Sequence, residues 1–493
     1  MDIYSIIEMV VQDWIWGTPL IVIVLAIGVI FMVGSRFFPI RHFGHVMKNV
    51  INNLTGKGGN GDEEKGLLSS IQATAVAIGT TVGVGNIGGV ASAIVIGGPG
   101  AVFWMWVAGF LGMGLKMVEI TLAVYYRSED LNGEVYGGPN YYMNKGLGKE
   151  MGWKHIFKIF SFLFAFGFCF TYIVSIQTYT VAEAVANTFN WSLLVTAIVY
   201  TVILYIMLAG GLKGLGKTAV VMVPFMCIFY LVGGLFIIFR EASAIPECFR
   251  LIFDGAFNGT AALGGFGGAA FSVAIKTGMA RSVFSNEAGW GSAAMVHATA
   301  KVDHPVKQGM FGVFEVFVDT FLICTITALT IIITGQWSSG LDGATLTLSA
   351  FEIGLGSLGR IVLAIGIFFF GITTSTGGYA QVEVVLRYLL GDRPLKNKIL
   401  AFYKWTFPLP SLIMVAIAVF IGMPGAYLWL ISDMSTGLPI FANLITIAVL
   451  FPTFLKLLKD YKARYMGIGQ IDPNMAVFYE DKVRKEKERK ETA

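Results

Sequence analysis

One glycine-rich stretch, GTTVGVGNIGG at residues 79–89, carries residue types that can bind phosphate, carboxylate or cations. Within it, Gly83, Gly85 and Gly88 form G-x-G-x-x-G, the pattern that opens a dinucleotide-binding fold. That fold needs a strand before the motif, a helix after it and an acidic residue about 20 positions on. Here both flanks are apolar and the next acidic residue is Glu119. The motif therefore does not indicate a nucleotide site.

A second segment, GLKGLGKT at residues 211–218, matches the P-loop pattern G-x-x-x-x-G-K-[ST]. A P-loop connects a strand to a helix inside a nucleotide-binding domain, and the chain has no polar stretch long enough for one. We interpret the segment as a turn between two membrane spans, with Lys213 and Lys217 in the cytoplasm. The sequence also lacks H-E-x-x-H, C-x-x-C and a nucleophile elbow, so we do not predict an enzyme.

Composition indicates a membrane protein. Of 493 residues, 55% are hydrophobic and 13% charged, and the mean hydropathy is +0.71. Soluble domains carry about 25% charged residues. Eleven apolar stretches approach the roughly 20 residues that a spanning helix needs. These are residues 18–35, 67–97, 101–126, 157–185, 193–209, 218–239, 260–281, 309–334, 358–390, 399–421 and 426–458.

Basic residues predict the orientation of these spans. Lysine and arginine are concentrated in alternate connections and in the tail at residues 459–493, whereas the other connections contain few apart from Arg240 and Arg250. The positive-inside rule then places the N-terminus outside and the C-terminus in the cytoplasm. We expect a multi-pass protein of the cell (inner) membrane, surrounded by the lipid bilayer. No nucleic-acid or protein partner is predicted.

In a membrane span, the glycines at 79–89 predict an interruption of the helix. Each glycine lowers helix propensity by about 1 kcal/mol relative to alanine, so the cluster favours an interrupted helix. Unwound backbone is tolerated in a membrane where it lines a cavity or is buried in protein. Its carbonyls could coordinate a cation, and its N–H groups could hold a carboxylate. A small-residue packing face between helices is the alternative that spacing alone leaves open.

A second glycine-rich segment, residues 264–278, suggests a matching interruption that includes Ser272, Lys276 and Thr277. Broken helices at corresponding positions of two halves are typical of inverted-repeat secondary transporters. A third polar patch, Thr373 to Thr376, contributes four hydroxyls that could bind a cation or cap helix carbonyls. The predicted units are residues 1–66 (extra span and linker), 67–259 (first repeat), 260–458 (second repeat) and 459–493 (tail).

Two segments resemble a known family. GGPGAVFWMWV at 97–107 and ARSVFSNEAGWGSAA at 280–294 are similar to signatures of the prokaryotic alanine/glycine:cation symporters, and the resemblance extends over essentially the whole chain. It implies an all-α fold of the leucine-transporter type, with eleven spans: one extra helix and a core of five plus five inverted spans. It also implies sodium-coupled, sometimes proton-coupled, carriage of alanine and glycine.

The resemblance also implies site residues, because GTTVGVGN is similar to the unwound first core helix, G-x-x-V-G-x-G-N, of that fold. One sodium site would use the carbonyls of Gly79 and Val82 and the hydroxyls of Thr373 and Thr374. A second cation site would use the carbonyl of Thr81 and the side chains of Asn86 and Ser272. The substrate carboxylate would meet the N–H groups of Val84 and Gly85, and its ammonium the carbonyls of Phe271, Ser272 and Ala274. Facing the pocket would be Phe168, Phe170 and Gln177.

Two further features have open roles. FSNEAG, at residues 284–289, is expected at the cytoplasmic end of the sixth core span, as a gate or packing motif. Glu315 and Asp319 share one helix face and could tune coupling or pair with Lys276 or Arg281. The sequence thus predicts sodium-coupled uptake of alanine and glycine by alternating access, with Na⁺ as coupling ion and no other cofactor. A proton-coupled symporter of the same fold and a non-coupled channel are the alternatives.

Overall fold

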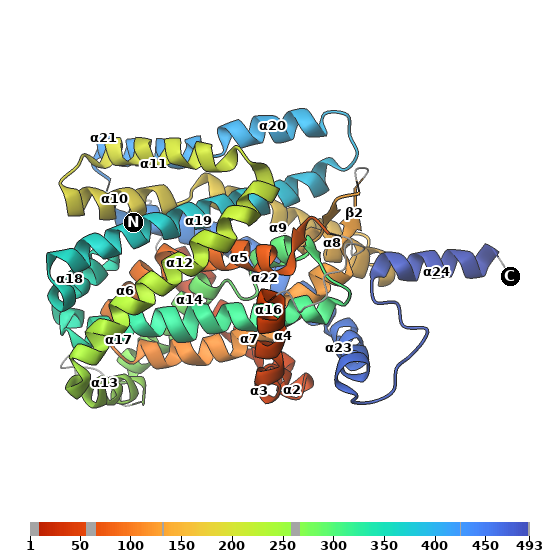
Figure 1. Cartoon of the computed structure of the whole chain (residues 1–493), viewed down its shortest axis with the longest axis horizontal. Helices are drawn as coiled ribbons and strands as arrows, with labels where there is room; N and C mark the ends of the chain where they lie inside the picture. The colour runs from red at the N-terminus through yellow and green to blue at the C-terminus, as the bar shows by residue number, and fades with distance from the viewer. Residues whose placement is uncertain (1–8, 56–65, 131–132, 258–266, 424, 492–493) are drawn as a thin grey trace.

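The computed structural model of the chain describes residues 9–55, 66–130, 133–257, 267–423 and 425–491. Most of these residues are helical (Figure 1). The helices up to the middle of the chain are α2 (Thr18–Gly34), α3 (Phe38–Arg41), α4 (Phe43–Leu54), α5 (Ser70–Thr81), α6 (Val90–Gly97), α7 (Ala101–Tyr125), α8 (Pro139–Tyr142), α9 (Ile156–Ile173), α10 (Gln177–Phe189), α11 (Leu193–Leu208), α12 (Gly211–Arg240) and α13 (Ile245–Phe257).

The helices of the second half follow the same pattern of long apolar rods joined by short connections. They are α14 (Gly267–Asn286), α15 (Ser292–His297), α16 (Pro305–Val316), α17 (Thr325–Ile333), α18 (Gly343–Leu355), α19 (Ser357–Leu390), α20 (Lys396–Thr406), α21 (Leu409–Ile421), α22 (Gly425–Val449), α23 (Phe451–Met466) and α24 (Tyr479–Glu491). π-Helical turns occur at η1 (Val10–Ile15), η2 (Gly85–Gly89), η3 (Met143–Glu150) and η5 (Phe317–Cys324), and 3₁₀ turns at η4 (Ala242–Ala244) and η6 (Gln336–Ser338).

Within the described residues, seven helices are long and apolar enough to cross a membrane, and eight if the bent pair at Ser70–Thr81 and Gly85–Gly97 is one span. Three shorter apolar helices are Thr18–Gly34, Leu193–Leu208 and Gly343–Leu355. The first two coincide with predicted spans, whereas the third, α18, was not predicted. The sequence-based total of eleven spans remains a prediction, and residues 260–266 of the seventh lie outside the described part.

The first predicted interruption is confirmed. Helix α5 begins with a capping box, in which Ser69 Oγ accepts from Gln72 N (3.2 Å) and Gln72 Oε1 accepts from Ser69 N (3.0 Å). It ends at Thr81, and the second half-helix starts at Gly85 with a bend of 45°. Gly83 stands at the bend, where an added Cβ would lie 2.5 Å from Thr374 Oγ1. A side chain at this position would displace that hydroxyl.

The second interruption lies elsewhere than predicted. Helix α14 is continuous from Gly267 to Asn286, so the segment at 264–278 is not a break within the described residues. The chain leaves the helix only at Glu287, and Glu287, Gly289 and Gly291 all have positive φ (54°, 85° and 88°). Left-handed residues of this kind end helices. Gly278 serves close packing instead, because an added Cβ would lie 2.2 Å from Ala101 O.

Helices α7, α16–α17 and α19 run along the long axis of the molecule, and α4 and α23 lie across them (Figure 1). Helix α14 packs on α6 and α7, while α5 packs on α12 and α19, so the helices that lead into both breaks lie within the bundle. At the end that carries α24, strand β1 (Leu68–Ser69) pairs in parallel with β4 (Ala300–Lys301). The chain before the first broken helix is thereby joined to the chain after the second. A small hairpin, β2 (Ser128–Glu129) with β3 (Val135–Tyr136), is antiparallel.

Candidate functional site

A cavity of about 40 Å³ lies where the two helix breaks meet. Five segments of the chain line it: the α5–η2 break, the α9–α10 junction, the end of α14 with the break after it, α19 and α22. The lining residues are Thr80, Thr81, Gly83, Val84, Gly85, Thr171, Tyr172, Ser175, Ile176, Gln177, Phe284, Glu287, Trp290, Thr374, Ser432 and Thr436. The small volume suits a ligand of only a few heavy atoms.

Several sequence-predicted residues meet at this cavity. Val84 and Gly85 stand in the first turn of the second half-helix, where backbone N–H groups have no intrahelical acceptor. Gln177 lines the cavity, and its Oε1 is buried without a hydrogen-bond partner. Phe168 lies behind the lining and packs on Tyr172.

Other predicted residues lie away from it. Phe170 stacks on Phe166, which is 53% exposed, so its ring lies on the outer side of α9. Phe271 packs on Trp104, and Ser272 is exposed. Ala274 is buried beside Gly97. The predicted ammonium subsite formed by Phe271, Ser272 and Ala274 is therefore not at the cavity.

Helix geometry gives the reason for this difference. Ser272 and Ser285 are thirteen positions apart in continuous α14, which is about 20 Å at about 1.5 Å per residue. Only the C-terminal end of α14 reaches the cavity, through Phe284. The sequence analysis placed the second break too early in the chain. The predicted ammonium subsite therefore lies about 20 Å along α14 from the cavity.

The predicted hydroxyls of α19 lie beside the first break. Thr374 Oγ1 donates to the carbonyls of Gly79 (3.1 Å) and Thr80 (3.3 Å). Thr373 Cβ lies 3.0 Å from the position of an added Cβ at Gly79, although its hydroxyl bonds carbonyls of its own helix. Val82, directly after α5, is fully buried. Hydroxyl and carbonyl oxygens from two helices therefore converge here.

Asn86 is the hub of a second polar cluster. Its Oδ1 accepts from Gly83 N (2.8 Å), and its Nδ2 donates to Asp319 Oδ1 (2.5 Å). Asp319 also accepts from Ser285 Oγ (3.0 and 3.1 Å) and Thr320 Oγ1 (2.9 Å). All four side chains are at most 2% exposed. The cluster joins the first break to the end of α14 and to η5.

Charged residues of α7 form hydrogen bonds with the backbone on both sides of the second break. Lys116 Nζ donates to the carbonyl of Asn286 (2.7 Å), the last residue of α14. Glu119 Oε1 accepts from Gly291 N (3.1 Å), directly before α15. Asn443 of α22 donates to the Gly289 carbonyl (2.8 Å) and to Glu119 Oε2 (3.1 Å). Backbone groups freed by the break are thereby satisfied, as a buried break requires.

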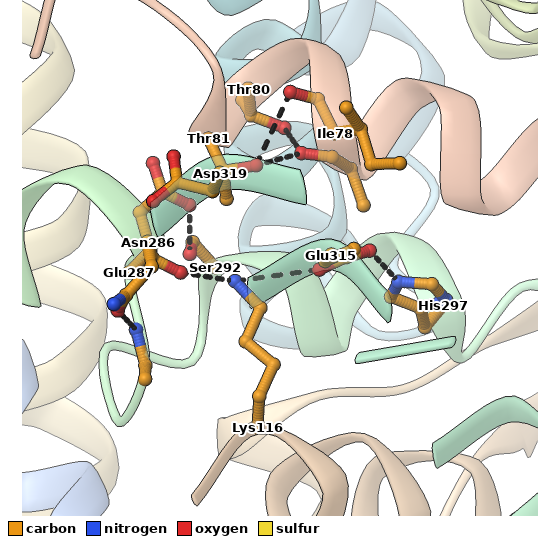
Figure 2. A network of polar contacts seen from close by, with 12 residues as sticks. Ile78, Thr80, Thr81, Lys116, Asn286, Glu287, Ser292, His297, Glu315 and Asp319 are labelled. Atoms are coloured by element: carbon orange, nitrogen blue, oxygen red, sulfur yellow. Dashed lines mark hydrogen bonds and ion pairs between the residues drawn. The ribbon is translucent and has the colours of Figure 1, made fainter. Parts of the chain in front are cut away.

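The Lys116 ammonium also pairs with Glu315 Oε2 at 3.5 Å (Figure 2). Glu315 in turn bonds His297 Nε2, and Gln308 bonds His297 Nδ1 (2.6 Å). Figure 2 shows Lys116 reaching between Asn286 and Glu315. The expected alternatives, Lys276 or Arg281 as partners of Glu315, are therefore wrong. Arg281 instead pairs with Asp433 at 3.2 Å.

Residues 1–471 match the sequence model of the sodium:alanine symporter family. The chain belongs to this family. Among its curated relatives is the sodium/alanine symporter AgcS of Methanococcus maripaludis, with 37% identity over 82% of this chain and 87% of that protein. The putative sodium/proton-dependent alanine carrier YrbD of Bacillus subtilis is 34% identical over 96% and 97%. The probable sodium/glutamine symporter GlnT of Bacillus subtilis is 34% identical over 96% and 92%.

Membership in the sodium:alanine symporter family makes the chain a transporter, not an enzyme, and with its apolar helices a multi-pass membrane protein. Sequence reasoning missed more than half of the residues that line the cavity. The missed residues are Thr171, Tyr172, Ser175, Ile176, Phe284, Glu287, Trp290, Ser432 and Thr436. A signal existed for three of them, because Phe284 and Glu287 belong to the FSNEAG motif assigned to a gate and Trp290 directly follows it. No comparable sequence signal marked Ser432 or Thr436.

Proposed function

We propose that this symporter couples Na⁺ entry to the uptake of small neutral amino acids, alanine and glycine. The observation that carries the proposal is the meeting of two helix breaks at one small cavity, because ion and substrate can then stabilise the same backbone geometry. The N–H groups of Val84 and Gly85 would hold the substrate carboxylate. The cavity volume of about 40 Å³ is in keeping with a small substrate.

The first sodium site would lie between α5 and α19. We assign to it the carbonyls of Gly79 and Val82 and the hydroxyls of Thr373 and Thr374, since hydroxyl and carbonyl oxygens are the ligands that hard cations prefer. The hydrogen bonds from Thr374 to the carbonyls of Gly79 and Thr80 support this, because they hold three oxygens together. A bound cation would take the place of these hydrogen bonds, and the Thr374 hydroxyl would keep its proton and turn a lone pair toward the ion.

The second cation site would centre on Asp319. It keeps the Thr81 carbonyl and Asn86 but uses Ser285 in place of Ser272, because Ser285 is the serine of α14 that contacts this cluster. A fully buried carboxylate beside an amide and two hydroxyls suits a monovalent cation. It also suits a proton, so proton coupling remains the second candidate.

Alternating access would follow from movement of one group of helices against the rest, in two inverted halves of five spans. Pairing of β1 with β4 supports a closure at the end that carries α24, because it joins the two broken helices there. We place this end in the cytoplasm and the N-terminus outside, in accord with the lysine and arginine distribution.

Uptake of labelled L-alanine into proteoliposomes tests the proposal. With an inward Na⁺ gradient, we expect concentrative, saturable uptake, at least about tenfold faster than with choline at fixed pH. Glycine should compete and leucine should not. Uptake driven by an imposed pH gradient without Na⁺ would establish proton coupling instead. Non-saturable flux that never exceeds the external concentration would indicate a channel.

Replacing Thr374 by valine tests the first sodium site. We expect the half-saturating Na⁺ concentration to rise about tenfold, because loss of one hydrogen-bonding ligand costs on the order of 1–2 kcal/mol. The KM for alanine at saturating Na⁺ should stay within about twofold. Thr201→Val is the matched control, since Thr201 is a buried threonine that bonds only its own helix. Equal sodium dependence in both variants would contradict this site.

A further inference from the structure

Glu287 is a buried acid at the cavity. Its side chain is 4% exposed and lines the cavity together with Trp290 and Val84. Ser292 Oγ donates to its carboxylate (Figure 2). Within the described part of the chain, no lysine, arginine or histidine nitrogen lies within 4.0 Å of it. Lys116, which bonds the neighbouring Asn286 carbonyl, acts on this carboxylate electrostatically from beyond that distance. A buried carboxylate with no counter-ion in contact is costly, which makes this group a binding point for a cation.

The backbone fixes this side chain at the cavity. Glu287 has a φ of 54°, a left-handed conformation that costs a non-glycine residue about 1–3 kcal/mol. Hydrogen bonds hold the residues on either side of it: the Asn286 carbonyl accepts from Lys116, and Ala288 N donates to Asn286 Oδ1 (3.0 Å). Strain held in this way by surrounding bonds is typical of functional positions.

The other walls of the cavity present hydrogen-bond donors. Val84 and Gly85 offer first-turn N–H groups, and Trp290 Nε1 is buried without a partner. The same small cavity thus combines an acid on one segment with donors on another. A ligand that carries both a cationic and an anionic group on neighbouring atoms matches this combination.

We propose that Glu287 binds the ammonium group of the substrate, and that the cavity selects zwitterionic α-amino acids by this contact. The inference rests on the proposed function as an amino-acid symporter. It replaces the ammonium subsite expected at Phe271, Ser272 and Ala274. Ser292 acts as a positioning residue, because its hydroxyl orients the carboxylate.

Alanine binding to the purified, detergent-solubilised protein tests the inference by calorimetry at saturating Na⁺. We expect Glu287→Gln to weaken alanine binding at least tenfold, because a charge-assisted bond to the ammonium becomes a neutral one. Glu287→Asp should recover part of the affinity. Sodium binding measured without alanine should stay within about twofold of wild type. Glu247→Gln is the control, since Glu247 is exposed and bonds only Arg250 on α13.

The outcomes separate this inference from the proposed function. If wild type binds alanine and Glu287→Gln binds it equally well, the inference is overturned and the function stands. If the variant changes sodium affinity but not alanine affinity, Glu287 is a sodium ligand and the inference is again overturned. If wild type shows neither alanine binding nor sodium-driven uptake, the proposed function itself fails.

A measurement on wild type alone removes any dependence on the folding of the variants. Propionate keeps the carboxylate and carbon chain of alanine but lacks the ammonium group. We expect propionate at one hundred times the alanine Kd to leave alanine binding unchanged, and equal competition by propionate and alanine would overturn the inference. In Glu287→Gln, the preference for alanine over propionate should fall at least tenfold.

Discussion

Replacing Asn86 by alanine is expected to reduce sodium-driven alanine uptake at least about 100-fold. The side chain bonds Gly83 N at the helix break and the Asp319 carboxylate, both of them buried. Leaving a buried polar group without its partner costs on the order of 1–3 kcal/mol, and more for a charged one. Two such losses amount to roughly 3 kcal/mol or more, which is two decades in an equilibrium constant. Uptake assays in proteoliposomes measure the effect.

Both the KM for alanine and the half-saturating Na⁺ concentration should rise, because Asn86 links the substrate cavity to the proposed second cation site. Asn187→Ala is the control, since Asn187 is exposed near the end of α10. A variant that changes sodium dependence alone would separate Asn86 from the substrate side. Uptake at the wild-type rate would show that the cluster around Asp319 has no part in transport.

The first break could be predicted because it rests on local chemistry. Five glycines in eleven residues weaken any helix, and polar residues among them mark a lined cavity. The second break depends on fewer signals. Glu287, Gly289 and Gly291 make the turn, whereas Gly278 lies within a continuous helix because Ala101 packs against it. A glycine that breaks a helix and one that permits close packing look alike in a sequence.

The site residues divide in the same way: those near the first break could be predicted from the sequence, and those near the second could not. Val84, Gly85, Gln177 and Thr374 reach the cavity, because each was assigned relative to the correctly placed first break or to nearby spans. The residues assigned on α14 do not, since an error of about thirteen positions along a helix moves a side chain about 20 Å. Ser432 and Thr436 come from α22, and only tertiary packing brings that helix to the cavity.

The partners of Lys116 and Glu119 could not be predicted from the sequence either, for a different reason. Charged residues within a span are functional candidates by default, yet their partners cannot be read from their own helix. Lys116 meets the carbonyl end of α14 and Glu119 meets the N–H before α15, so each charge matches the backbone group that the break exposes. The two residues are three positions apart and therefore lie on one face of α7. The cost of burying these charges is offset by their hydrogen bonds to the backbone and by the ion pair of Lys116 with Glu315.

Replacing Lys116 by methionine is expected to abolish uptake and to lower the melting temperature of the purified protein by several degrees. Removing one member of a buried ion pair costs about 3–5 kcal/mol, because the other charge is left uncompensated. Here Glu315 would lose its ammonium partner and the Asn286 carbonyl its donor. Lys158→Met is the control, since Lys158 is an exposed lysine of α9.

The double variant Lys116→Met/Glu315→Gln separates the two roles of Lys116. Neutralising Glu315 removes the uncompensated charge, so the melting temperature should return at least halfway to that of wild type. Uptake should not return, because the Asn286 carbonyl still lacks its donor and the break beside Glu287 is no longer held. Recovery of both quantities would show that Lys116 serves only to neutralise Glu315. Recovery of neither would mean that the bond to the Asn286 carbonyl accounts for the stability as well as the uptake.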